Sequence, residues 1–233
     1  MSTLLEDVNN QKLEEFVRWF LRLNGYFGIE NFIVHAADDP ERISDGVVAP
    51  HTETDTLAVR MPYSQEIAGN LRIANYPPLV TGASGKFDVV IAEAKSGNEN
   101  KPNKVWTGKE APVEYIVRFI GLNQSEEHIK RASSGLLSNY SWEDERARYR
   151  YIIFSEKPNE HYQSKGLTYL TYAEIIRFLV EIRGSCWVEA NIGVASVHYQ
   201  WNPTIRLVFD IANSTDRSIQ ERCEQIMKLI NGS

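Results

Sequence analysis

Cysteine is scarce in this chain of 233 residues, which contains only Cys186 and Cys223. Two cysteines form neither a disulfide framework nor a zinc site, so we expect ordinary reduced thiols, as in the cytosol. The sequence also lacks an apolar run long enough to cross a membrane and a charged-then-apolar signal at its N-terminus. These absences predict a soluble, cytoplasmic protein that has no membrane partner.

Positive charge is not in excess, because 25 lysines and arginines face 31 acidic residues and give a net charge of −6. This balance argues against a general nucleic-acid coat protein, although an acidic protein can still contain a locally basic site. The chain has no Gly-rich phosphate loop, no G-x-S-x-G motif and no histidine pair at metal-ligand spacing. Of the five scattered histidines, only His51 is expected near the site described next.

Residues 87–96, FDVVIAEAKS, have the pattern of a central strand, because the first half is almost entirely apolar. Side chains alternate along a strand, so Glu93 and Lys95 project from the same face near its end. Taken alone, this pair has a simple interpretation as a salt bridge at the exposed end of a buried strand.

A second acid, Asp55, lies in residues 51–60, HTETDTLAVR, where the pattern predicts a strand beginning near Glu53. If the two strands pair as a hairpin, Asp55 and Glu93 converge and form a hard oxygen site of the kind that Mg²⁺ uses. Lys95 would then hold a phosphate or orient and activate the attacking water. Asp88 competes for the role of the first acid, but its position five residues before Glu93 places it on the opposite face.

Asp55 followed by Glu93-Ala94-Lys95 resembles the PD-(D/E)xK pattern of the restriction-endonuclease-like nucleases. The order of expected elements is also similar: a helix over 13–23, a strand over 31–35, the two strands bearing the acids, then a helix and a strand. The chain departs from the pattern at Thr54, which replaces a proline, and in a long connection over 61–86. The resemblance implies an α/β (α+β) fold with a mixed central sheet flanked by helices.

The resemblance also divides the chain into a nuclease-like core over residues 1–184 and a C-terminal extension over 185–233, packed on the core. In the extension, residues 194–202 and 205–211 alternate in a way that predicts two strands, or one strand and an irregular segment. Residues 218–230 have the apolar spacing of a terminal helix. Further helices are expected over residues 112–121, after Ser125 and up to Gly184.

The activity implied by the resemblance is metal-dependent endonucleolytic hydrolysis of phosphodiester bonds in DNA. Asp55 and Glu93 would bind Mg²⁺, or Mn²⁺ in its place, and Lys95 would position the water. A homodimer is a further expectation, because cutting both strands usually takes two sites. Two alternatives stay open: an inactive domain of the same fold that binds a partner or has a structural role, and an unrelated α/β domain in which Asp55 and Glu93 lie far apart.

In such nucleases a glutamate on the first helix reaches toward the metal, and here Glu14 and Glu15 are the candidates. We favour Glu14, because it flanks the buried face of the helix, whereas Glu15 lies on the stripe of Trp19. Acidic residues near a helix start are also favoured by the helix dipole alone, so this assignment has a purely structural alternative.

Basic residues occur in two further stretches. Between Lys95 and Lys109 there are four lysines and one glutamate, and this loop could contact phosphates while Trp106 stacks on a base; a packed tryptophan is the simpler interpretation. Before a strong strand over 151–154, arginines alternate with other residues. These arginines are Arg146, Arg148 and Arg150. Their alternation predicts either a row that contacts phosphates or an exposed strand edge.

Overall fold

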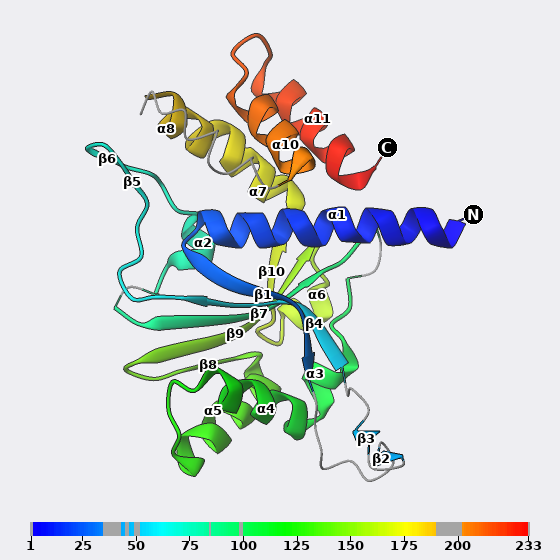
Figure 1. Cartoon of the computed structure of the whole chain (residues 1–233), viewed down its shortest axis with the longest axis vertical. Helices are drawn as coiled ribbons and strands as arrows, with labels where there is room; N and C mark the ends of the chain where they lie inside the picture. The colour runs from blue at the N-terminus through cyan, green and yellow to red at the C-terminus, as the bar shows by residue number, and fades with distance from the viewer. Residues whose placement is uncertain are drawn as a thin grey trace.

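A mixed sheet with helices on both faces forms the centre of the protein (Figure 1). The computed structural model describes residues 2–34, 43–44, 47–48, 52–83, 85–97, 100–189 and 202–232, with side chains except at 2–10, 43–44 and 47–48. The strands of the main sheet are β1 (Tyr26–Val34), β4 (Thr52–Arg60), β7 (Phe87–Ala94), β8 (Ser141–Glu143), β9 (Ala147–Ser155) and β10 (Thr168–Thr171). Their order is β1-β4-β7-β9-β10, with β8 paired to β9. This arrangement confirms the predicted mixed α/β class.

Strand β7 is the centre of the sheet, with antiparallel β4 on one side and parallel β9 on the other. Its middle residues are almost fully buried, which explains the apolar run in the sequence. Val90 and Ala92 pack into the core beneath α1, whereas Val89 and Ile91 pack into the core on the other face. The sheet therefore separates two hydrophobic cores, and alternation along β7 assigns each side chain to one of them.

The upper face in Figure 1 is covered by α1 (Ser2–Leu23), above which the C-terminal helices pack. These helices are α7 (Tyr172–Phe178), the π-helical η2 (Leu179–Arg183), α8 (Gly184–Glu189), α10 (Pro203–Asn213) and α11 (Ile219–Asn231). The aromatic ring of Phe20 makes edge contacts with Tyr76, Phe154 and Phe178 at centroid distances of 5.5–6.5 Å. Such contacts join α1 to the sheet and to α7. None of the helices in the described residues is long and apolar enough to span a membrane.

The lower face is covered by α3 (Lys104–Gly108), α4 (Glu110–Ile120) and α5 (Glu126–Asn139). The predicted helices are present here, and α5 begins where expected because the Ser125 hydroxyl accepts a bond of 3.1 Å from the His128 amide. The remaining short elements are β2 (Ile43–Ser44), β3 (Val47–Val48), β5 (Ile67–Ala68), β6 (Leu71–Arg72), α2 (Pro77–Val80) and α6 (Glu160–Gln163).

The C-terminal extension contains a helix where a strand was predicted, so the assignment of residues 205–211 was wrong. Asn202 caps α10 by accepting bonds from the amides of Thr204 at 2.7 Å and Ile205 at 3.2 Å, and Pro203 occupies the first helical position. The buried positions Ile205, Val208, Phe209 and Ala212 follow helical spacing. Residues 194–201 lie outside the described residues. The terminal helix is confirmed as α11.

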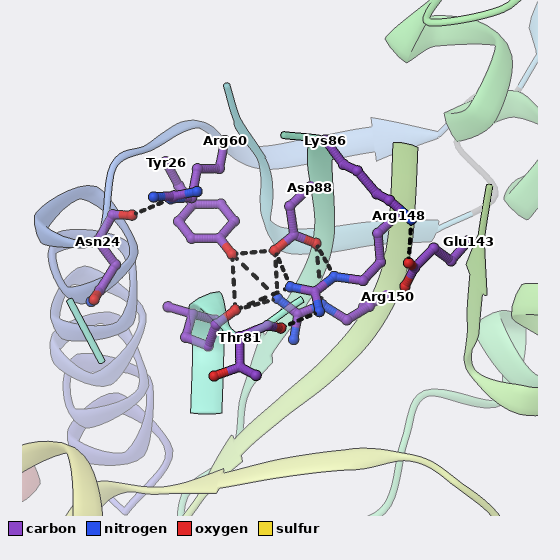
Figure 2. Close-up of polar contacts among 10 residues, drawn as sticks. Asn24, Tyr26, Arg60, Thr81, Lys86, Asp88, Glu143, Arg148 and Arg150 are labelled. Carbon is purple, nitrogen blue, oxygen red and sulfur yellow. Dashed lines mark hydrogen bonds and ion pairs between the residues drawn. The ribbon is translucent and has the colours of Figure 1, made fainter. Parts of the chain in front are cut away.

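The expected arginine row is also corrected by the structure. Arg148 and Arg150 are only 9% and 7% exposed, so they form neither a phosphate-contacting row nor an exposed edge. Arg146 is exposed. The two buried guanidinium groups bind Asp88 (Figure 2). Asp88 projects from the sheet face that α1 covers, as alternation along β7 predicts.

Asp88 is fully buried and accepts hydrogen bonds from both arginines and from Tyr26. Arg148 Nε and Nη2 donate at 3.0 and 2.8 Å, Arg150 Nη2 at 2.6 Å, and the Tyr26 hydroxyl at 2.5 Å. The arginines also donate to the carbonyl oxygens of Leu79 and Thr81. Burial alone would raise the pKa of Asp88, but the arginines outweigh burial and hold the pKa below its usual range.

Replacing Asp88 with asparagine should leave two buried arginines without their anionic partner. We expect Asp88→Asn to lower the free energy of unfolding by about 3–5 kcal/mol, measured by urea denaturation at pH 7. Glu143→Gln is the control, because its pair with Lys86 is partly exposed and should contribute less than about 1 kcal/mol. Equal losses for the two variants would show that the buried network does not stabilise the fold.

Candidate functional site

Asp55 and Glu93 meet at the end of the sheet where β4 and β7 stop pairing. The last paired residues are Thr56 and Ala92. One step further, the Asp55 carboxylate accepts a hydrogen bond of 2.7 Å from the Ala94 amide. The side chain of Asp55 thus takes the place of a backbone partner beside Glu93. The expectation that these two acids lie far apart, which belonged to the alternative of an unrelated domain, is therefore wrong, while the relation to the nuclease family stays a prediction.

Glu93 and Lys95 form the ion pair that their spacing predicts. The Lys95 Nζ lies 2.7 Å from Glu93 Oε2, and the side chains of Lys95 and Glu93 are 24% and 3% exposed. The partners of the Glu93 carboxylate in the described ranges are the Lys95 ammonium and the nearby Tyr151 hydroxyl, and neither makes a hydrogen bond of normal geometry to it. A buried carboxylate with unfilled lone pairs is costly, so this position favours a further cation or donor.

The Asp55 carboxyl has an unusually high pKa for an aspartate. Burial raises its pKa to about 6, the Ala94 amide and Lys95 oppose this shift, and the charges of Glu93 and Glu53 add to it. Glu53, at the start of β4, is exposed, and the sequence analysis did not include it in the site. The high pKa of Asp55 thus reflects burial first and the neighbouring acids only in second place.

Glu14 on α1 belongs to the same group of charges. Its pKa is raised to about 7, first by burial and then by the negative charges of Asp55 and Glu53, while Lys95 acts in the opposite direction. Glu15 instead accepts a bond of 2.7 Å from the side chain of Asn202 and faces α10. The preference for Glu14 over Glu15 therefore agrees with the geometry, since neighbouring helix residues point about 100° apart.

The structure adds Tyr151, a residue that the sequence analysis did not assign to the site. Burial and then the charge of Glu93 raise the pKa of the Tyr151 hydroxyl well above its usual value. The same hydroxyl accepts a bond of 3.1 Å from the Asn103 amide. An aromatic residue on a buried strand has the pattern of ordinary core, so the sequence gives no signal for this role.

Two further expectations concern residues near the site. Trp106 is 2% exposed and packs in the lower core, so the interpretation as a packed tryptophan is confirmed and stacking on a base is wrong. His51 lies outside the described residues.

The carboxylates of this site fit a hard divalent cation. Mg²⁺ requires only one or two carboxylates and keeps several waters, so Asp55 and Glu93 are sufficient as direct protein ligands. The observation in favour of such an ion is that buried Glu93 has one cationic partner, Lys95, and keeps lone pairs without a hydrogen bond of normal geometry. Within the described ranges, no group of three or more His, Cys, Asp or Glu side chains could hold a metal ion. Glu14 would then contribute through water, and metal binding stays a prediction.

Comparisons with protein-family models, with curated proteins and with solved structures found no match. The function of the site is therefore argued from its residues.

The pKa values predict that the candidate site destabilises the protein at neutral pH. Folded Asp55 and Glu14 hold protons to about pH 6 and 7, whereas the unfolded groups release them near their ordinary values of 3.8 and 4.5. These groups therefore make stability fall as pH rises from about 4 to 7. We expect Asp55→Asn to raise the free energy of unfolding by about 1–2 kcal/mol at pH 8, with little gain at pH 4.

This prediction is checked by urea denaturation across pH 4–8 without divalent metal. Glu15→Gln is the control for removing a carboxylate elsewhere. The Glu15 carboxylate lies on the same helix as Glu14 but bonds Asn202 instead of facing Asp55. A gain for Asp55→Asn that does not depend on pH would contradict the electrostatic explanation.

Proposed function

We propose that this protein is a metal-dependent endonuclease that hydrolyses phosphodiester bonds in DNA. The observation that supports this most is the convergence of Asp55, Glu93 and Lys95 at one strand end, with the Glu93 carboxylate buried and incompletely satisfied. Acids held close together beside one lysine lower the free energy of unfolding unless a further cation binds them. Such unfavourable groups of charges are common in active sites. The resemblance to PD-(D/E)xK nucleases is carried by these same residues.

Each residue has a defined task in this proposal. Asp55, fixed by the Ala94 amide, and Glu93 hold Mg²⁺, which when bound lowers the pKa of water and neutralises charge on the phosphodiester. Lys95 orients the attacking water and stabilises the negative charge that develops on the phosphoryl oxygens. Glu14, with a pKa of about 7, can hold or release a proton near neutral pH.

The second candidate is a catalytically inactive domain of the same fold that binds a partner or has a structural role. The observation in its favour is the Glu93–Lys95 ion pair, because Lys95 already supplies one cation to the buried carboxylate. The two functions differ in whether the site binds metal and whether DNA is cut.

We expect Mg²⁺- or Mn²⁺-dependent cleavage of linear, supercoiled or branched DNA by the full chain. Asp55→Asn and Lys95→Met should each reduce the cleavage rate at least about 100-fold, because each removes a group that stabilises the transition state. Glu15→Gln should cut like the parent protein, because this carboxylate faces α10. RNA substrates run in parallel would identify a ribonuclease.

Folding of every variant is confirmed by circular dichroism before the assay. Equal cleavage by the parent and both site variants would indicate a contaminating nuclease or a wrong site.

Metal binding can be measured separately from cleavage. We expect isothermal titration to show binding of Mn²⁺ to the parent protein and its loss in Asp55→Asn. A bound ion should also raise the free energy of unfolding, by about 2.7 kcal/mol at a concentration 100 times Kd. No binding together with no cleavage would favour the inactive domain.

A further inference from the structure

The chain that follows the E-A-K strand is held in place by tyrosine hydroxyls. We refer to residues 100–109 as the basic segment. The Tyr169 hydroxyl donates a bond of 2.7 Å to the carbonyl oxygen of Asn100, and the Tyr151 hydroxyl accepts one of 3.1 Å from the Asn103 amide. The Tyr172 hydroxyl lies 3.2 Å from the carbonyl oxygen of Lys95, just before the segment. Strands β9 and β10 thus position Asn103 and Asn100 of the basic segment, and helix α7 positions Lys95.

The inner side of the basic segment is packed against the protein. Pro102 is buried, and Trp106 is buried in the lower core. Asn103 caps α3 by accepting a bond of 3.0 Å from the Val105 amide, and its Nδ2 donates to the Thr52 hydroxyl at 3.2 Å. These contacts hold the backbone of the segment in one conformation.

The outer side of the segment carries Lys101 and Lys104, which are both exposed. Among the residues that the structure describes, neither has an ion-pair partner. The basic segment contains three lysines and no acidic residue, although the whole chain has a net charge of −6. The lysines are therefore a local concentration of positive charge on a fixed backbone.

The position of the segment relates this charge to the candidate site. Asn103 contacts Tyr151, whose hydroxyl is influenced by Glu93, and Thr52, which precedes Asp55 by three residues on β4. The basic segment therefore contacts β4, which bears Asp55, and β9, whose Tyr151 hydroxyl is close enough to Glu93 for its charge to act on it.

We propose that Lys101 and Lys104 bind backbone phosphates of the DNA next to the bond that is cut. The inference rests on the proposed function for the identity of the ligand. Lysine contacts to phosphate position a substrate without reading its sequence. Because the backbone is already fixed, binding orders only the two lysine side chains, which reduces the entropic cost of association.

The test is binding of a fluorescently labelled DNA duplex, measured by anisotropy with Ca²⁺ in place of Mg²⁺ over a series of salt concentrations. Lys101→Ala/Lys104→Ala should weaken binding about tenfold at low salt and reduce the slope of log K against log salt by about 1.8. Lys101→Arg/Lys104→Arg should bind like the parent protein, because it keeps both charges. Lys228→Ala is the control, since this exposed lysine lies on α11 above the opposite face.

The outcomes separate the inference from the proposed function. Unchanged affinity and salt slope in the double alanine variant would overturn the inference, even if the parent protein cuts DNA. Weakened binding by that variant, in a protein that never cuts, would support the phosphate contacts and reject the nuclease. A parent protein that neither binds nor cuts DNA would reject both.

Discussion

The pairing of β4 with β7 determines where the charged groups of this protein lie. Because the ladder ends at Thr56 and Ala92, the next residue on each strand is an acid, and Asp55 turns to bond the free amide of Ala94. A shift of one residue in this register would place each acid on the wrong face. The hydrophobic cores on both sides of the sheet fix the register. They therefore hold the carboxylates of Asp55 and Glu93 close together, which lowers the free energy of unfolding.

The two ends of β7 show opposite solutions for a buried carboxylate. Asp88 is surrounded by two guanidinium groups and a phenol, and its pKa is lowered. Glu93 has one ammonium partner and lies beside Asp55, whose pKa is raised. In the first arrangement both carboxylate oxygens accept hydrogen bonds and the acid stabilises the fold, whereas the second leaves capacity for a positively charged ligand. This contrast distinguishes a structural network from a candidate active site within a single strand.

The strands that bear the acids were predictable, because alternation determines which way a side chain projects, whereas the site role of Glu14, which helical spacing favours, stays a prediction. The same rules do not reveal what covers a face. Arg148 and Arg150 share one face of β9 as alternation predicts, but the fully buried Asp88 that pairs with both is an acid from β7 and could not be inferred from β9 alone. The apolar run after Ile205 fits a strand or a helix by periodicity alone, and the helix is determined by the Asn202 cap and by Pro203 in the first turn. Tyr151 could not be predicted, because an aromatic residue on a buried strand resembles ordinary core and its closeness to Glu93 depends on the pairing of β7 with β9.

The arginines of β9 also connect parts of the chain that are far apart in sequence. Arg148 bonds the carbonyl oxygen of Thr81, from which it is separated by 67 residues, and Arg150 bonds that of Leu79 across 71 residues. The carbonyl groups of Leu79, in α2, and of Thr81, just after it, therefore gain their arginine partners only when β9 has joined the sheet, although Tyr26 also donates a bond of 3.3 Å to Leu79. Closing contacts of such length is slow, so these arginine bonds should form late in folding, after β7 and β9 have paired.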